Sequence, residues 1–421
     1  MEEIGKARSQ RRIIIAGMAG NVLEWYDFSV YGFFAESIGQ NFFPSHSRTT
    51  SLMEAFAVFA AGFLMLPFGA LLFGHLGDRE GRERALTLSV LAMAVPTFLI
   101  GLLPTYNQIG VTATVIMVIL RLVQGLSVGG EYTTSVVYMV ERAPGNRRGM
   151  TGAFGAAGAF GGVMLGSAVG GLVAALMPAA ALHLWGWRIP FLAGISIGSA
   201  GYLMRRELRA GAVLPHAAPP SIGAVLRAHW RTILQVTGYK ALDAVGFYLM
   251  FVYATTYLTE IVGLSHVHTM AINTLGMAAA IIALPIAGAL SDRFGRKPLA
   301  LGATLGALLF ARPLFHLLWH PRFSVPLIGQ MGFAMIIAMF EGVAPAAAAE
   351  AFPASVRCVG VAISHNLCMA ALGGTALMVA TYLIARTHNE FAPPMYLMAA
   401  AAISAVMVLT MRETAKLPLA G

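Results

Sequence analysis

The sequence predicts an all-α membrane protein of about twelve transmembrane helices, arranged as two parallel repeats of six helices. Composition is the first observation behind this prediction: 57% of the 421 residues are hydrophobic, 11% are charged, and the mean hydropathy is +0.72. Because a soluble domain of this size has roughly 25% charged residues, most of this surface must face lipid. The second observation is a series of apolar stretches of the length needed to cross a bilayer, about 20 residues. The third is an internal repeat.

The apolar stretches are separated by short polar loops. In chain order they cover residues 13–37, 52–76, 85–104, 111–140, 150–176, 187–205, 232–258, 268–291, 298–319, 324–348, 356–385 and 392–411. The longest polar connection, 205–231, is rich in proline and arginine and lies near the middle of the chain. We therefore expect an N-terminal six-helix half at 1–204, a cytoplasmic linker at 205–231 and a C-terminal six-helix half at 232–421.

Basic residues are concentrated in alternate loops. The formal net charge is +9, from 28 Lys and Arg against 19 Asp and Glu. Most of the basic residues lie in one set of loops and in the two termini, which is the distribution found on the cytoplasmic face of membrane proteins. This pattern argues against nucleic acid as a partner. It predicts a multi-pass membrane protein with both termini in the cytoplasm.

A short motif occurs twice at corresponding positions. Gly-His-Leu-Gly-Asp-Arg-Glu-Gly-Arg at 74–82 follows the second stretch, and Gly-Ala-Leu-Ser-Asp-Arg-Phe-Gly-Arg at 288–296 follows the eighth, 214 residues later. A looser pair, 141–148 and 350–357, is 209 residues apart and follows the fourth and tenth stretches. Two copies in the same sense indicate parallel six-helix repeats.

The repeated motif has a physical interpretation at the helix ends. Glycines permit a tight turn between helices, and an aspartate followed by arginines can make charge-assisted contacts with neighbouring helix ends. A generic basic turn would explain one copy but not two copies in register. We therefore expect a cytoplasmic latch formed by Asp78, Arg79, Gly81, Arg82, Asp292, Arg293, Gly295 and Arg296.

Three longer segments resemble a known family. They are GNVLEWYDF at 20–28, RLVQGLSVGGEY at 121–132 and WGWRIPF at 185–191. With the two latch motifs, they are similar to the metabolite:proton symporter family of the major facilitator superfamily over nearly the whole chain. The resemblance implies the major facilitator fold and import of α-ketoglutarate, citrate, shikimate, proline or betaine with protons. The chain departs from the family at Leu66, where an arginine is usual, and at Glu80 and Glu83 in the first latch.

Acidic residues inside the predicted helices are candidates for proton coupling. A charge at bilayer depth costs at least about 2.5 kcal/mol, so each needs a partner, a wet cavity or a function. Glu24 and Asp27 are three residues apart on one helix, and two acids so close do not both ionise easily. Either could instead form a polar helix contact. The proton-coupling candidates are Asp27, which we favour, and Glu24, Glu131, Asp243 and Glu341, with Glu131 and Glu341 expected to face each other by repeat symmetry.

Basic and amide side chains inside the helices are candidates for substrate binding. Arg121, Gln124 and Glu131 share one stripe of the fourth stretch, and a guanidinium binds a carboxylate through two hydrogen bonds. Arg121 could instead bridge helices, and Lys240 could simply pair with Asp243. The substrate-binding candidates are Arg121, Gln124, Lys240, Tyr26, Tyr132, Phe247 and Gln330.

Four other residues have a less specific interpretation. Arg312 is expected to extend to the membrane interface, and His365 could carry a proton or pack through hydrogen bonds. Cys358 and Cys368 lie about 15 Å apart on one predicted helix, too far for a disulfide. Metal-ligand spacing is absent, so we expect no metal site.

The function expected is proton-coupled import of a small organic acid, a di- or tricarboxylate such as α-ketoglutarate or citrate. The alternative is import of a compatible solute, proline or betaine. Export is less favoured, because the superfamily's exporters often have a Gly-Pro motif in the fifth helix and this chain has none there. Catalytic motifs and a long soluble domain are absent, so we expect no enzyme, no sensor and no cofactor. The expected partners are a small-molecule substrate, protons and lipid, and the chain is expected to be a monomer.

Overall fold

The computed structural model describes residues 2–80, 82–196 and 222–419, without the side chains of 2–13, 16, 17, 19, 23, 74, 77–80, 82, 83, 85 and 86. In the first part of the chain the helices are α1 Glu2–Phe33, α2 Ala35–Phe42, α3 Arg48–Leu64, α4 Leu66–Glu80, α5 Arg82–Leu102, α6 Tyr106–Ile109, α7 Val111–Val128, α8 Glu131–Arg142, α9 Arg148–Leu176, α10 Ala179–Ala181 and the π-helix η1 Leu182–Gly186. A further helix follows at 188–196.

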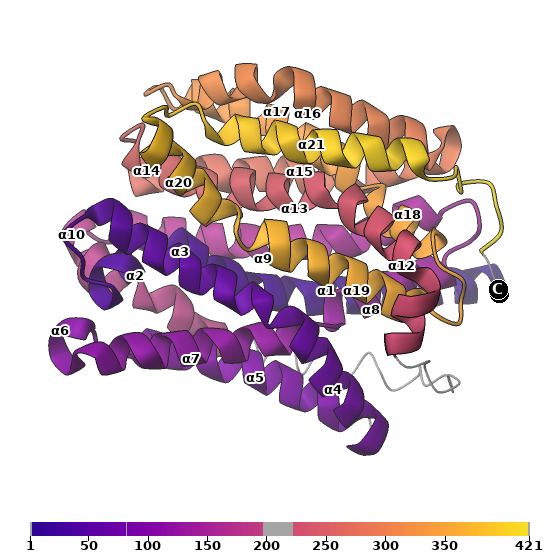
Figure 1. The fold of residues 1–421 in the computed structure, drawn as a ribbon, viewed down its shortest axis with the longest axis horizontal. Helices are drawn as coiled ribbons and strands as arrows, with labels where there is room; N and C mark the ends of the chain where they lie inside the picture. The colour runs from indigo at the N-terminus through magenta and orange to yellow at the C-terminus, as the bar shows by residue number, and fades with distance from the viewer. Residues whose placement is uncertain (1, 81, 197–221, 420–421) are drawn as a thin grey trace.

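The second part of the chain is also helical. Its helices are α12 Ile222–Tyr239, α13 Ala241–Tyr248, the π-helix η2 Leu249–Tyr253, α14 Ala254–Glu260, α15 His266–Phe294, α16 Arg296–Leu318, α17 Ser324–Glu341, α18 Ala344–Glu350, α19 Arg357–Cys368, the π-helix η3 Met369–Gly373, α20 Ala376–Thr387 and α21 Pro393–Thr410. The long helices run roughly alongside one another, and their connections gather at two ends of the bundle (Figure 1).

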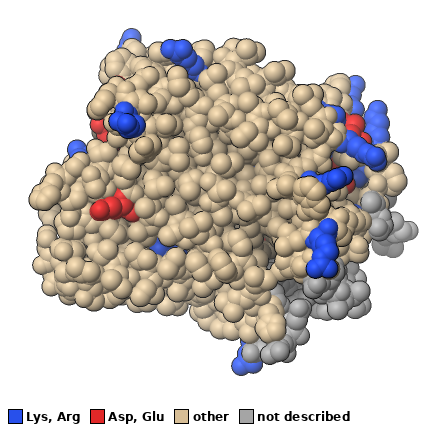
Figure 2. Space-filling model, in the orientation of Figure 1, with Lys and Arg blue, Asp and Glu red and all other residues tan. Residues whose placement is uncertain are grey.

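Among the described residues, nine continuous helical segments are long and apolar enough to cross a membrane. Helix α1, helix α5 and the helix at 188–196 occupy the positions of the first, third and sixth predicted spans. On the face shown in Figure 2, charged side chains gather toward the two ends of the helices and leave an uncharged band between them. This band has the character expected of a lipid-facing surface.

Several predicted spans are broken near the middle of the bundle. The fourth span breaks between α7 and α8 at Gly129 and Gly130, where the backbone of Gly130 (φ −136°) leaves the helical region. The seventh span breaks at Lys240 and then continues through the π-helix η2, and the eleventh contains the π-helix η3. Such irregularities in a helix frequently mark functional sites, and these three lie on helices from both halves of the sequence.

The predicted linker at 205–231 needs a correction at its C-terminal side. Residues 222–231 belong to α12, which begins at Ile222 and has a kink at His229. The reason is that this part of the chain carries apolar as well as polar residues. Val225 and Ile233 are buried and pack in one apolar cluster with Val137 and Phe352. Residues 205–221 lie outside the described part of the chain. The division at 1–204 and 232–421 remains a prediction.

Helix α9 packs closely against α1 and α15 because glycines line its contact faces. A Cβ atom added at Gly162 would lie 2.3 Å from the carbonyl oxygen of Val22 in α1. At the other contact, a Cβ added at Gly288 in α15 would lie 2.6 Å from the carbonyl oxygen of Gly149. Small residues allow helix backbones to approach in this way. The first and second halves of the sequence therefore meet along α9 and α15.

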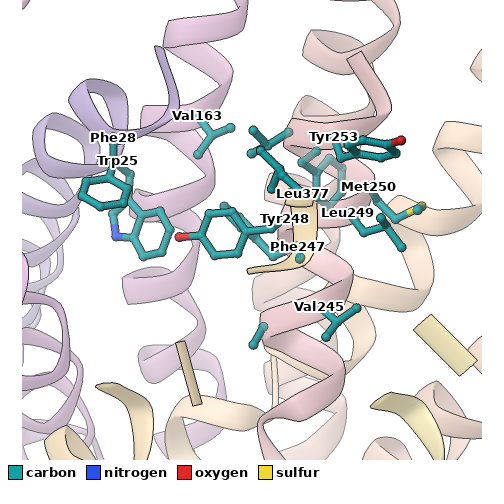
Figure 3. Packing of buried hydrophobic residues seen from close by; sticks show 14 of the residues in the cluster. Trp25, Phe28, Val163, Val245, Phe247, Tyr248, Leu249, Met250, Tyr253 and Leu377 are labelled. Atoms are coloured by element: carbon teal, nitrogen blue, oxygen red, sulfur yellow. The ribbon is translucent and has the colours of Figure 1, made fainter. Parts of the chain in front are cut away.

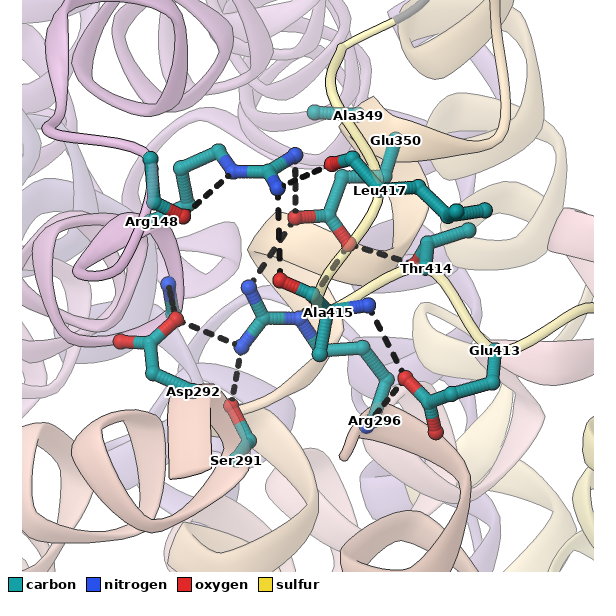
Figure 4. Close-up of polar contacts among 12 residues, drawn as sticks. Arg148, Ser291, Asp292, Arg296, Ala349, Glu350, Glu413, Thr414, Ala415 and Leu417 are labelled. Carbon is teal, nitrogen blue, oxygen red and sulfur yellow. Dashed lines mark hydrogen bonds and ion pairs between the residues drawn. The ribbon is translucent and has the colours of Figure 1, made fainter. Parts of the chain in front are cut away.

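Asp292 connects the two halves at one end of the bundle, which we call the latch end. Its two carboxylate oxygens accept hydrogen bonds from the backbone N–H groups of Gly149 (2.8 Å) and Met150 (2.9 Å), in the first turn of α9. Asp292 also pairs with Arg296 at 2.8 Å. A carboxylate at a helix N-terminus satisfies unpaired N–H groups and interacts favourably with the helix dipole, so this contact holds α15 against α9 (Figure 4).

The second repeat identified in the sequence forms a reciprocal exchange of ion pairs at the latch end. Glu141 after the fourth span pairs with Arg357 at 2.5 Å, and Glu350 after the tenth span pairs with Arg148 at 2.9 Å. Each half therefore contributes the acid of one pair and the base of the other. Glu350 also pairs with Arg296 at 3.0 Å, so the two exchanged pairs join the Asp292 contact in one network.

The segment after α21 crosses this network (Figure 4). The carboxylate of Glu413 accepts hydrogen bonds from the backbone N–H groups of Arg296 and Lys297, both at 2.9 Å, and Arg148 donates to the carbonyl oxygen of Leu417 at 2.5 Å. Burial alone would raise the pKa of Glu413, but these backbone hydrogen bonds outweigh it and lower that pKa. This segment, which we call the C-terminal strap, therefore connects the two halves through an ionised carboxylate and a hydrogen bond to Arg148.

The structure does not describe the first copy of the latch in the same detail. Gly81 lies outside the described residues, as do the side chains of Asp78, Arg79 and Arg82. In the second copy, Asp292 and Arg296 belong to the network, and Gly295 has a φ of +112° that favours glycine at the turn between α15 and α16. Arg293 is exposed and lies over the ring of Phe294 instead.

We expect Asp292→Ala to weaken closure of the latch end. Loss of two charge-assisted hydrogen bonds and an ion pair should cost about 2–4 kcal/mol. Amide hydrogen exchange in the first turn of α9, at Gly149 and Met150, should become at least about tenfold faster. Arg293→Ala, which changes an exposed neighbour, is the matched control and should leave that exchange unchanged. Equal exchange in both variants would show that Asp292 does not hold the latch.

Candidate functional site

A cavity lies between the two halves, near the breaks in the helices. We call it the central cavity, and its empty space of about 380 Å³ includes the part that is open to solvent. The first half contributes the residues Glu24, Trp25, Phe28, Phe63, Leu66, Val128, Gly129, Tyr132 and Thr133, and the second half contributes Tyr248, His365, Asn366 and Met369. A smaller neighbouring cavity shares Tyr132, Thr133 and His365 with it and reaches Lys240.

Aromatic rings form most of the wall of the central cavity. Tyr248 extends from α13 toward Trp25 of α1 (Figure 3), with the two rings stacked at a centroid distance of 6.2 Å. Trp25 also meets Tyr132 of α8 edge to face at 5.8 Å, and Phe63 meets Tyr248 at 5.0 Å. Because these contacts join rings of both halves, a change in the distance between the halves must rearrange the cavity wall.

A charged cluster adjoins the cavity. Lys240 lies 2.9 Å from Asp243 and 3.9 Å from Glu341, and Tyr132 donates a hydrogen bond to Glu341 at 3.0 Å. All four side chains are buried. Burial of charge is tolerated only when the charges are paired, and here one cation lies between two acids. The cluster therefore joins α8 of the first half to α13 and α17 of the second through groups that can gain or lose a proton.

Several polar atoms that face the cavity have no hydrogen-bond partner among the described residues. They are Nε1 of Trp25, the hydroxyl of Tyr248 and Nδ1 of His365. A buried polar group without a partner costs about 1–3 kcal/mol. Water or a polar solute in the cavity would satisfy these groups, which is the property expected of a binding site.

Arg121 lies behind the cavity wall in a pocket of its own. Its guanidinium carbon is 4.1 Å from the ring of Phe28, 4.5 Å from that of Tyr31 and 4.8 Å from that of Phe59. The side chain is fully buried, and Nε and Nη2 have no hydrogen-bond partner among the described residues. Because Phe28 also lines the central cavity, one phenyl ring separates the cavity from this cation.

Arg121 is linked to Asp27 by hydrogen-bonding side chains. Nη1 of Arg121 donates to Gln124 at 3.1 Å, and the amide of Gln124 donates to the hydroxyl of Thr97 at 2.8 Å. Thr97 lies beside the buried carboxyl of Asp27, while its own hydroxyl donates to the carbonyl oxygen of Met93 at 2.8 Å. The acid and the cation thus occupy two ends of a polar chain inside the first half, without a direct ion pair in the described structure.

The structure separates the remaining candidates. Glu24 lines the cavity, whereas Glu131 is half-buried and outside its lining. Glu341 accepts its hydrogen bond from Tyr132, and the facing of Glu131 and Glu341 stays a prediction. Phe247 packs against Trp25. Tyr26 and Gln330 are directed elsewhere: Tyr26 donates to the carbonyl oxygen of Pro190, and Gln330 to that of Met250.

Sequence reasoning left Trp25 out of the site, and it gave His365 only an open interpretation. His365 stacks beside Tyr132 at 5.0 Å, and its neighbour Asn366 donates to the carbonyl oxygen of Gly129 at 2.5 Å across the halves. The available signal was the run of polar residues Ser364, His365 and Asn366 inside an apolar stretch. Such polar residues inside a membrane span face the bundle interior.

Two halves of membrane-spanning helices, joined at a latch and enclosing a polar cavity, define a transporter of the major facilitator fold. The predicted fold class is confirmed by comparison with solved structures: the proton:xylose symporter XylE superposes with a TM-score of 0.75 over 98% of both chains, at 17% identity. The chain belongs to the sugar (and other) transporter family, whose model matches residues 13–205 and 223–421.

Curated relatives cover nearly the whole chain. The proline/betaine transporter of Escherichia coli (strain K12) is 32% identical over 98% of this chain and 85% of its own length. The citrate-proton symporter of Klebsiella pneumoniae is 36% identical over 94% of this chain and 90% of its own. The alpha-ketoglutarate permease of Escherichia coli (strain K12) is 36% identical over 88% and 87%. These relatives confirm the resemblance found in the sequence.

Proposed function

We propose that this protein is a proton-coupled symporter that imports a small organic acid, a di- or tricarboxylate such as α-ketoglutarate or citrate, by alternating access. The observation that carries the proposal is Arg121, a fully buried guanidinium with two unpartnered nitrogens one ring away from the central cavity. A buried cation in that condition is stabilised by an incoming carboxylate, which can accept two parallel hydrogen bonds. The names of the citrate and α-ketoglutarate relatives agree with this substrate class.

Coupling to protons follows from the polar chain between Asp27 and Arg121. When Asp27 is protonated, its carboxyl no longer offers a negative charge to Arg121, and an anionic substrate is attracted to the guanidinium. When Asp27 loses its proton, its negative charge competes with the substrate for the same cation. Proton and anion therefore bind together and leave together. The Lys240, Asp243 and Glu341 cluster offers a second group of acids that responds to movement between the halves.

A compatible solute such as proline or betaine is the second candidate. The observation that favours it is the wall of Trp25, Phe28, Tyr132 and Tyr248 with Glu24 beside it. Aromatic faces attract quaternary and secondary ammonium groups, and a carboxylate strengthens that attraction. The proline/betaine relatives support this candidate.

Uptake into proteoliposomes decides between the candidates. Purified protein should accumulate labelled citrate or α-ketoglutarate when the outside is more acidic than the inside, and a protonophore should abolish the accumulation. Accumulation of proline or betaine instead would establish the second candidate. Uptake that continues unchanged after collapse of the proton gradient would contradict proton coupling.

We also infer the orientation in the membrane. The latch end faces the cytoplasm of a bacterial inner membrane, with both termini on that side, because basic residues gather in the loops of that end. The C-terminal strap at the latch end agrees with this orientation. The transporter works as a monomer, and its driving force is the proton gradient without a cofactor.

A further inference from the structure

Two histidines and a glutamate meet at the end of the bundle opposite the latch, which we call the far end. Glu36 lies in α2, His183 in η1 and His266 at the start of α15, and one potential ligand atom of each lies within 4.8 Å of the other two. The sequence expectation of no metal site rested on spacing along the chain. These residues come from three distant segments, so spacing could not reveal them.

The surrounding contacts hold the two histidines in place. Asn41 donates hydrogen bonds to the backbone carbonyl oxygens of Ser37 (2.7 Å) and His183 (3.0 Å), which fixes η1 against α2. The hydroxyl of Ser37 lies 3.1 Å from Nδ1 of His183. A proton on Nδ1 donated to Ser37 would leave Nε2 as the ligand atom, and such a hydrogen bond commonly orients metal-binding histidines. The rings of His183 and His266 are 5.2 Å apart.

Two further charged residues lie beside the three side chains. Glu36 uses Oε1 to accept hydrogen bonds from Gln40 and Arg48. The carboxyl group of Glu260 pairs with the same guanidinium of Arg48 at 2.7 Å and contacts Glu36.

We propose that Glu36, His183 and His266 form a binding site for a divalent transition metal ion, with Zn²⁺ the best match. Two imidazoles and one carboxylate, with a fourth position for water, are a common Zn²⁺ ligand set. Ligands about 2.0–2.2 Å from tetrahedral Zn²⁺ lie roughly 3.3 Å apart, so the side chains need to move by on the order of 1 Å.

The site bridges the two halves. Glu36 and His183 belong to elements of the first half, whereas His266 begins α15 of the second half. A bound ion would therefore hold the far end closed. The consequence for transport rests on the proposed alternating-access function: Zn²⁺ acts as an inhibitor that prevents the far end from opening.

Zn²⁺ binding to the purified full-length protein is the first test, because it does not depend on transport. Isothermal titration should give one ion per chain, and His183→Ala and His266→Ala should each weaken binding by at least about tenfold. His268→Ala is the matched control, since His268 is exposed, lies two residues from His266 and packs on Phe323. Thermal unfolding without metal identifies variants that fail to fold, and His183→Gln or His266→Gln then replaces the alanine variant at the same position.

The second test is Zn²⁺ inhibition of uptake, measured with whichever solute the protein accumulates. Inhibition should be lost in His183→Ala and His266→Ala and kept in His268→Ala. Binding that is equal in all four proteins, or absent from the unmodified protein, would overturn the site. Binding that depends on both histidines without inhibition of measurable uptake would keep the site and overturn the bridging role. If no solute is accumulated, the proposed function fails while the binding result still decides the metal site.

Discussion

Arg121→Ala should abolish gradient-driven uptake of the organic acid. Two charge-assisted hydrogen bonds of about 1.5–3 kcal/mol each are lost, so uptake at low substrate concentration should fall by at least about a hundredfold. Arg121→Lys keeps the charge but not the paired donors, and it should retain a small part of the activity. Initial rates in proteoliposomes, together with stabilisation of purified protein by citrate or α-ketoglutarate, measure both effects.

Folding should not account for that loss. Arg121→Ala removes a buried charge with unpartnered nitrogens but also loses ring contacts and the hydrogen bond to Gln124. These effects oppose each other, so the variant is expected to unfold at a temperature close to that of the unmodified protein. Arg312→Ala removes an exposed arginine from another helix and serves as the control. Uptake by Arg121→Ala at a rate near that of Arg312→Ala would exclude a substrate role for Arg121.

The architecture could be predicted because its signals are local or periodic. Apolar stretches of bilayer length depend on composition alone, and the offset between Asp78 and Asp292 required only a comparison of the chain with itself. The looser repeat identified Glu141, Arg148, Glu350 and Arg357 as corresponding residues. It could not show that each acid pairs with the arginine of the other half, because that depends on how the halves dock.

The candidate site was predicted less completely because helix irregularities decide which side chains face the cavity. A wheel with 100° per residue assumes an unbroken helix. The break at Gly129 and Gly130 interrupts the helix between Gln124 and Glu131, so a single wheel does not relate the two positions. Glu24 and Asp27 are 60° apart on such a wheel, and in the structure Glu24 lines the cavity whereas Asp27 faces Thr97.

The sequence left alternative roles open for some residues, and the structure reduces these alternatives. Lys240 does pair with its neighbour Asp243. It also lies near Glu341, which belongs to another helix, so the local ion pair is only part of a larger cluster. The aromatic wall was harder to foresee. Trp25 and Tyr248 are typical packing residues in membrane helices, and only their meeting across the halves makes them part of the cavity.

Asp27→Asn should separate transport from the proton gradient. Asparagine has nearly the shape of a protonated aspartate and cannot release a proton, so the polar chain through Thr97 and Gln124 to Arg121 stays in its substrate-binding state. Accumulation against a concentration gradient should fall to the level of equilibration. Exchange of labelled for unlabelled substrate, which needs no net proton movement, should continue at a rate within about a factor of three, roughly 0.7 kcal/mol, of the unmodified protein.

The comparison with Glu24→Gln makes the Asp27 experiment decisive. Both acids are buried on the same helix, but Glu24 lines the central cavity, whereas Asp27 lies beside Thr97, which accepts a hydrogen bond from Gln124. Glu54→Gln, at an exposed position of α3, controls for the loss of any acid. If Glu24→Gln shows exchange without accumulation while Asp27→Asn accumulates normally, the coupled proton resides at the cavity wall. The opposite result places proton and anion at the two ends of one polar chain, where the negative charge of Asp27 decides whether Arg121 retains its substrate.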